Sequence, residues 1–212
     1  MKNNKIVNIR TLAIIIVVLG HSIILYSTSW GIYQSINKVK FLDTLKNIIN
    51  LIQMPLFFSI SGFLLYYSLN KNINFREFII KKVKRLIIPF IIFGIFWMIP
   101  IKLLVNYPGY QNLNLNQIIL RLLTGNDSGH LWYLPTLFII FLMIVFLKKC
   151  IIKNFDLVLF VILLVVSYFS SNLQINIFIK QASFYAFYFY LGTLINKYQK
   201  ISLNKYIIIL IL

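Results

Sequence analysis

Residues 86–105 read LIIPFIIFGIFWMIPIKLLV, an almost unbroken apolar stretch. An α-helix needs about 20 mostly apolar residues to cross the hydrocarbon core of a bilayer, and this stretch has that length. Similar runs lie at residues 6–26, 48–69, 131–147, 155–169 and 177–195, and a seventh begins near Tyr206 and reaches Leu212. The pattern predicts an all-α, polytopic membrane helical bundle with six complete transmembrane helices and the start of a seventh. Residues 1–212 are predicted to form one membrane-embedded domain that is incomplete at its C-terminus.

The composition is that of a membrane protein. Of the 212 residues, 60% are hydrophobic and only 12% are charged, whereas about a quarter of the residues in a soluble domain are charged. The net charge of +17 would indicate nucleic-acid binding in a soluble protein, but here the basic residues lie between apolar runs. We therefore expect the lipid bilayer as a partner and no nucleic acid. The single cysteine, Cys150, cannot form an intramolecular disulfide.

The distribution of basic residues predicts the orientation in the membrane, because lysine and arginine collect in cytoplasmic loops. Lys2 and Lys5 precede the first run, and the basic segments 70–85, 148–154 and 197–205 fall on the same side if every run crosses once. The opposite loops hold fewer basic residues: Lys38, Lys40, Lys46, Arg121 and Lys180. We predict a cytoplasmic N-terminus and a multi-pass protein of the cell (cytoplasmic) membrane.

Two ionisable residues interrupt the first run, and each costs several kcal/mol in a bilayer. Arg10 and His21 are 11 positions apart, which is about three helical turns, so both face the same side about 16 Å apart. One interpretation is that Arg10 extends to the cytoplasmic headgroups and His21 caps a buried carbonyl. The other is a shared polar cavity, in which a histidine deep in the membrane moves protons near neutral pH.

Four motifs carry a family resemblance. Arg10, ten intervening residues, then His21 and Ser22 form the first, and MPLFFSISGFL at 54–64 is the second. KKVKRLIIP at 81–89 and HLWYL at 130–134 are the third and fourth. Together, in this order, they resemble the acyltransferase-3 family of membrane acyltransferases, and the MPLFF form is similar to its sugar O-acetyltransferase, fucose acetylase-like branch. This chain has Gln53 where related sequences often have histidine, and the family usually has about ten helices.

The resemblance implies a bacterial cell-envelope enzyme that moves an acyl group, usually acetyl, from cytoplasmic acyl-CoA to a hydroxyl of a sugar or polysaccharide. Acetyl-CoA is then a co-substrate, with no permanently bound cofactor and no metal site. His21 is the expected general base, because a neutral imidazole can take the proton of an attacking hydroxyl. The donor phosphates are expected to bind Arg10, Lys82 and Arg85.

Other polar and aromatic residues are candidates for the acceptor site, each with a structural alternative. Ser22 is expected to orient the His21 ring or to act as an intermediate nucleophile. Ser61 lies with Ser59 and Gly62, where small residues also serve close helix packing. Trp132 either stacks on the sugar or belongs to an interfacial aromatic belt. His130, beside Asp127, is either a solvated loop residue or part of the acceptor site.

Two rival functions remain open at this stage. A transporter or flippase of a glycan or small anionic substrate would use the same polar cavity as a path, although such proteins more often show internal repeats. An accessory membrane subunit would not need Arg10 and His21 on one face.

Overall fold

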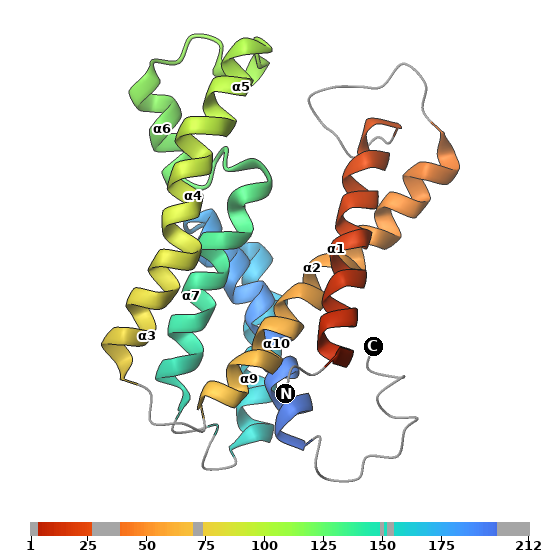
Figure 1. The fold of residues 1–212 in the computed structure, drawn as a ribbon, viewed down its shortest axis with the longest axis vertical. Coiled ribbons are helices and arrows are strands. Elements are labelled where there is room, and N and C mark those ends of the chain that lie inside the picture. Colours follow the sequence, from red (N-terminus) through yellow and green to blue (C-terminus); the bar gives the residue numbers. More distant parts are fainter. Residues whose placement is uncertain (1–3, 27–38, 70–73, 149–150, 152–154, 199–212) are drawn as a thin grey trace.

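The described part of the computed structural model comprises residues 4–26, 39–69, 74–148, 151 and 155–198, and within it every regular element is a helix (Figure 1). The predicted all-α class is therefore confirmed for these residues. The longer elements are α1 (Asn4–Ile23), α2 (Lys40–Leu69), α3 (Phe75–Lys82), α4 (Ile88–Phe93), α5 (Ile99–Leu104), α6 (Leu115–Thr124), α7 (Tyr133–Phe146), α9 (Asp156–Phe169) and α10 (Ile177–Tyr198). Short turns of helix are η1 (Ile24–Tyr26), η2 (Val83–Ile87), η3 (Gly94–Met98), η4 (Pro108–Tyr110), η5 (Gly129–Trp132) and η6 (Ser170–Asn172).

The apolar stretch at 86–105 belongs to one continuous helical column, α3–η2–α4–η3–α5, which begins at Phe75 rather than Leu86 (Figure 1). Lys82 and Arg85, predicted to lie in a loop, are therefore helical. The turns η2 and η3 are π-helical, and each precedes a proline, Pro89 or Pro100. Proline has no backbone N–H for the α ladder, and a π turn shifts the bonding by one residue, so the column continues through both prolines.

The main packing contact is the crossing of α2 and α10. Its closest points are two glycines: a Cβ on Gly62 would overlap the Phe189 carbonyl, and one on Gly192 would overlap the Ser59 carbonyl. Glycine at both positions lets the two backbones touch, as small residues do at membrane helix interfaces. Beside this crossing, Phe58 stacks on Tyr185 with ring centroids 4.5 Å apart.

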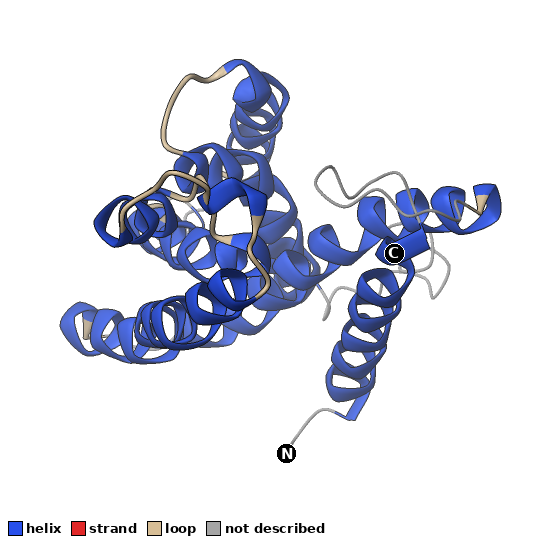
Figure 2. Cartoon of the chain, turned by 90° about the horizontal axis from the view of Figure 1, so that it is seen from above, coloured by secondary structure: helices blue, strands red, loops and turns tan. Residues whose placement is uncertain are grey.

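Helix α1 lies at the edge of the bundle and packs chiefly against α2, as Figure 2 shows for the helix next to the N-terminus. Its buried side faces α2 at Ala13, Gly20 and Ile23. The helix α2 starts at Lys40 instead of Ile48, so the prediction that Lys46 lies in a loop is wrong: Lys46 is helical and only 3% exposed. Lys180 is likewise in a helix, α10, and Arg121 is in α6.

Three helical segments are long and apolar enough to cross a membrane: Lys40–Leu69, Phe75–Leu104 and Gly129–Phe146. Shorter apolar helices lie at Val7–Ile23, Leu115–Thr124 and Asp156–Asn172. The outer surface of the long segments is apolar, with Leu51, Phe96 and Leu104 more than 70% exposed. Such a surface fits lipid rather than water. The seventh predicted run and Cys150 lie outside the described residues.

Candidate functional site

The structure brings the two histidines of the chain together. His21 lies in the last turn of α1, and His130 lies in η5 at the start of the α7 segment. Their ring centroids are 6.2 Å apart and the rings are nearly perpendicular. His21 is closer to the end of its helix than the apolar run to Tyr26 suggested, because α1 ends at Ile23. Two imidazoles at this separation, from helices distant in the sequence, form the centre of the candidate site.

The α2 side of this centre holds a buried lysine and a buried amide. A Cβ placed on Gly20 would lie 2.8 Å from Ile49 Cγ2, 3.1 Å from Gln53 Oε1 and 3.3 Å from Lys46 Nζ. Gln53 donates to Asn50 through its amide nitrogen at 3.0 Å, while its buried Oε1 has no partner among the described residues. Lys46 is within electrostatic range of the His21 imidazole. The Lys46 ammonium and the Gln53 amide oxygen thus lie next to Gly20, the residue before His21.

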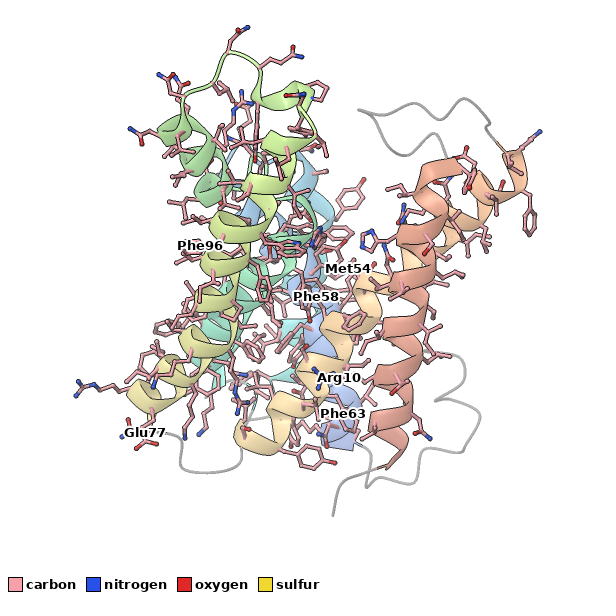
Figure 3. All side chains as sticks on the ribbon, turned by 45° about the horizontal axis from the view of Figure 1, so that its top comes forward. Arg10, Met54, Phe58, Phe63, Glu77 and Phe96 are labelled. Atoms are coloured by element: carbon pink, nitrogen blue, oxygen red, sulfur yellow. The ribbon has the colours of Figure 1, made fainter. Side chains whose placement is uncertain are left out.

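Arg10 lies on the side of α1 that faces the bundle. Its side chain extends from α1 toward α2 and α10 (Figure 3), and it is within electrostatic range of the Tyr133 hydroxyl. Since His21 meets His130 and Arg10 approaches Tyr133, both α1 side chains face the η5–α7 segment. Both residues lie in α1, for which helix geometry gives a rise of about 16 Å between them.

Lys82 and Arg85 are not part of this cluster. The Lys82 ammonium lies 3.4 Å from the centroid of the Phe141 ring, a cation–π contact with α7, while Arg85 is exposed on η2. Among the described residues, no hydrogen bond or ion pair joins either side chain to Arg10. They form a separate basic surface at the start of the helical column.

The two serines singled out in the sequence make local contacts. Ser22 donates to the Val18 carbonyl at 3.0 Å, which leaves its oxygen free to accept. Ser61 donates to the Phe57 carbonyl at 2.9 Å, and its oxygen lies 3.3 Å from the Tyr133 hydroxyl. Ser61 therefore belongs to the same α2–α7 contact that Arg10 approaches, whereas no contact in the described structure joins Ser22 to the His21 ring.

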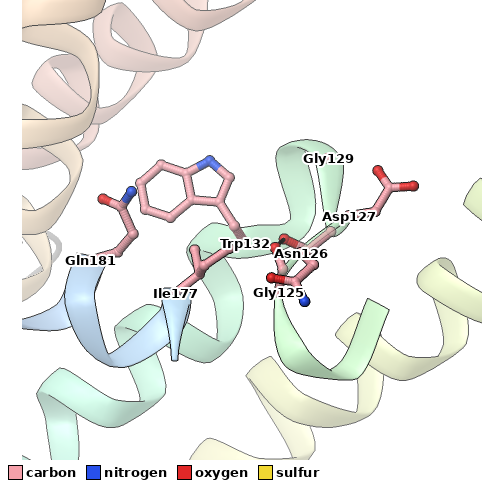
Figure 4. A pocket seen from close by; sticks show the side chains of 8 residues that line it. Gly125, Asn126, Asp127, Gly129, Trp132, Ile177 and Gln181 are labelled. Atoms are coloured by element: carbon pink, nitrogen blue, oxygen red, sulfur yellow. Dashed lines mark hydrogen bonds between the residues drawn. The ribbon is translucent and has the colours of Figure 1, made fainter. Parts of the chain in front are cut away.

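Trp132 packs inward and also lines an open pocket. Its indole stacks on Tyr185 with centroids 5.5 Å apart. The pocket, of about 270 Å³, is bounded by residues 125–129, Trp132, Ile177 and Gln181 (Figure 4). Trp132 therefore contacts both the inside of the bundle and the pocket. The same short turn, η5, carries His130 and Trp132, so the pocket adjoins the histidine pair.

An ion pair anchors the loop that forms this pocket. Lys102 Nζ lies 2.5 Å from Asp127 Oδ1, with both side chains less than a fifth exposed. The Tyr110 phenol is within electrostatic range of the Asp127 carboxylate. Burial, followed by the neighbouring carboxylate, raises the pKa of Tyr110 well above its ordinary value. The Lys102–Asp127 pair thus joins α5 to the loop that follows α6.

Comparison with known families decides the class of protein. The family model described as an acyltransferase domain, that of the acyltransferase-3 family, matches residues 3–212. The chain belongs to the acyltransferase-3 family. It is therefore an acyltransferase enzyme, and the family together with the apolar helices makes it a membrane protein. Neither the curated proteins nor the solved structures include a match to the chain.

Sequence reasoning missed several polar residues of this acyltransferase-3 protein. Lys102 lies inside the apolar stretch 86–105, and a charge inside such a stretch is a signal that a partner exists; that partner is Asp127. Lys46 and Gln181 gave no comparable signal, because each adjoins a polar segment and its surroundings are set by tertiary packing. Within the described residues, no group of three or more His, Cys, Asp and Glu side chains is close enough to hold a metal ion.

Proposed function

We propose that this acyltransferase-3 protein transfers an acyl group, most simply acetyl, from acyl-CoA to a hydroxyl of a sugar or cell-surface glycan. The observation that carries the proposal is the meeting of His21 with His130, 6.2 Å apart, beside an open pocket. Acyl transfer to oxygen requires a proton acceptor beside a pocket that can hold the hydroxyl-bearing acceptor. The sugar O-acetyltransferase-like motif at 54–64 supports a sugar as the acceptor.

The reaction needs a single base. The neutral His21 imidazole takes the proton of the sugar hydroxyl as that oxygen attacks the thioester carbonyl carbon. The tetrahedral intermediate collapses when the carbon–sulfur bond breaks, and the CoA thiolate leaves and receives the proton from the His21 imidazolium. The sugar ester and free CoA are the products, so atoms and charge balance. A positioned base of this kind contributes about 10²–10⁴-fold to the rate.

The donor is proposed to approach from the Arg10 end of α1. Arg10 is a bidentate partner for phosphate, and the thioester on the flexible arm of CoA then extends along about 16 Å of α1 to His21. Lys82 and Arg85 provide a second basic surface for the phosphates and are assigned the weaker role, since they lie apart from Arg10. Acyl-CoA is cytoplasmic, so its entry at the Arg10 end implies that the N-terminus and the basic segments are in the cytoplasm. The proposal therefore includes a multi-pass protein of the cell membrane with this orientation.

His130, Trp132 and Ser61 are assigned to the acceptor side. His130 faces the base directly, Trp132 lines the neighbouring pocket, and Ser61 lies beside Tyr133 at the α2–α7 contact. Ser22, whose hydroxyl donates to the Val18 carbonyl, keeps its expected role of orienting the His21 ring. The family assignment favours an enzyme over a transporter or flippase.

The test is transfer of label from acetyl-CoA to membrane glycans, comparing the chain with His21→Ala, Arg10→Ala and, as a control on α1, Leu19→Ala. Leu19 is 47% exposed and outside the proposed site. We expect His21→Ala to lower the transfer rate at least about 100-fold. Arg10→Ala is expected to raise the apparent KM for acetyl-CoA, with partial recovery in Arg10→Lys, while Leu19→Ala transfers normally. Transfer at the control rate in His21→Ala would show that His21 is not the base.

A further inference from the structure

We propose that the pocket bounded by residues 125–129, Trp132, Ile177 and Gln181, hereafter the loop pocket, binds one neutral sugar ring of the acceptor (Figure 4). The inference rests on the proposed function, because it takes the acceptor to be a sugar, and it adds the place and the charge of the sugar. The volume of about 270 Å³ corresponds to roughly nine waters, which is room for one sugar ring.

The lining combines an aromatic surface with an amide that has no hydrogen-bond partner among the described residues. Trp132 supplies an apolar, rigid ring against which the C–H groups of a sugar can lie. The Gln181 side chain makes no hydrogen bond to the described residues, so its carbonyl and its NH₂ are available to a ligand. Figure 4 shows Gln181 and the Trp132 indole beside each other at one end of the lining. An apolar wall with a few placed polar groups is typical of small-molecule sites.

The loop pocket carries no unpaired charge among its described residues. Its one ionisable lining residue is Asp127, whose carboxylate points away from the pocket in Figure 4 and pairs with Lys102. An anionic ligand would therefore find no cation there, and the phosphates of CoA are poorly matched to it. Burying a charge without a partner carries a large desolvation cost, and an uncharged polyol does not incur this cost.

Several contacts hold the pocket loop in place. Gly125 has φ +88°, a left-handed conformation that glycine adopts without strain. The Asp127 N–H donates to the Arg121 carbonyl at 3.2 Å, and Asn176 Nδ2 donates to the Thr124 carbonyl at 3.1 Å. With the Lys102–Asp127 pair, these contacts hold the loop against α5 and the end of α6, and hold that end against the residue before α10. A preformed wall loses little conformational freedom when a ligand binds.

A direct binding experiment tests the loop pocket without requiring catalysis. The full chain in detergent is titrated with methyl glycosides of glucose, galactose, mannose and 6-deoxygalactose, and with methyl glucuronide, by saturation-transfer NMR. We expect at least one neutral glycoside to bind, and the glucuronide to bind about tenfold more weakly than methyl glucoside or not at all. Trp132→Ala should abolish binding, and Gln181→Ala should weaken it about two- to tenfold. Trp97→Ala, an exposed tryptophan outside the pocket, should bind normally.

The outcomes separate this inference from the proposed function. Binding is expected to survive in His21→Ala, which lacks the base. If acetyl transfer works but Trp132→Phe and Gln181→Ala both keep the wild-type KM for the acceptor, the loop pocket is overturned and the transfer reaction stands. If glycosides bind in the pocket but no acetyl transfer occurs, the proposed function fails and the pocket stands. If none of the neutral glycosides binds to wild-type protein that elutes as a single folded species, the proposed role of the loop pocket is also overturned.

Discussion

Replacing Asp156 by alanine should destabilise the fold strongly, because this carboxylate is the centre of a buried network between α9 and α10. Its Oδ1 accepts from the Tyr190 hydroxyl at 2.9 Å, and its Oδ2 accepts from Lys197 Nζ at 2.6 Å and from the Tyr198 hydroxyl at 2.5 Å. Lys197 also donates to the Ile151 carbonyl at 2.7 Å. The ion-pair side chains are only 12% and 11% exposed.

The magnitude follows from what the substitution leaves behind. Removing one partner of a buried ion pair costs about 3–5 kcal/mol, because the other charge stays buried without compensation. For a chain of this size about 1 kcal/mol moves the melting temperature by about 2–4 °C, so Asp156→Ala should lower it by about 6–20 °C. The double variant Asp156→Asn with Lys197→Met removes both charges together. It should recover at least about half of that loss.

Thermal unfolding of the purified chain in detergent measures these shifts, with Glu77→Ala as the matched control. Glu77 pairs with Lys81 at 3.6 Å on an exposed helix surface, with both side chains more than 60% exposed. Such a pair contributes at most about 0.5 kcal/mol, so the control should shift the melting temperature by less than about 2 °C. If Asp156→Ala shifted it no more than Glu77→Ala, the network would not hold α9 to α10 and this reasoning would be refuted.

Three further perturbations test the packing and the site. Gly62→Ala should force α2 away from the Phe189 carbonyl of α10 and cost about 1–3 kcal/mol, measured as a lower melting temperature. An unchanged melting temperature would mean that the two helices are not in contact at Gly62. The pKa of Tyr110 is raised in the folded state, so the folded protein holds this proton more tightly than the unfolded chain does. The free energy of unfolding should therefore fall as the pH rises above about 10. Tyr110→Phe should remove that part of the pH dependence, and an identical pH curve would contradict the buried position of Tyr110. Gly20→Ala should push α1 away from Ile49 and lower the transfer rate in the same labelled-acetyl assay. A normal rate would show that the fit of α1 on α2 does not position His21.

Helix positions were predictable from the sequence where apolar length alone decides them. The run at 155–169 corresponds to α9 (Asp156–Phe169), and the run at 177–195 lies within α10 (Ile177–Tyr198). Hydropathy failed where a helix continues into polar sequence, as at the start of α2 and in α3, because lysines and asparagines there interrupt the apolar run but not the backbone hydrogen bonds. The short helix α6 was missed because it is amphipathic: polar residues alternate with its apolar residues, so it contains no long apolar run.

The candidate site was predictable only in part. The common face of Arg10 and His21 follows from helical periodicity, which is a local property. The approach of His130 to His21 is not local, since it depends on how α1 and η5 are placed by separate contacts. The pairing of Lys102 with Asp127 has the same character: each residue is visible in the sequence as an isolated charge, and only the packing of the loop on α5 makes them partners.

The position of His21 is set by α2 more than by α1 itself. Helix α1 packs chiefly on α2, and Gly20, the residue before the histidine, lies against α2 side chains with no room for a Cβ. Helix α2 in turn is fixed to α10 through Gly62 and Gly192, and α10 carries Gln181 of the loop pocket. One rigid sequence of contacts therefore runs from the base through α2 and α10 to the proposed acceptor pocket. Changes at the glycines should disturb catalysis through geometry, even though none of them touches a substrate.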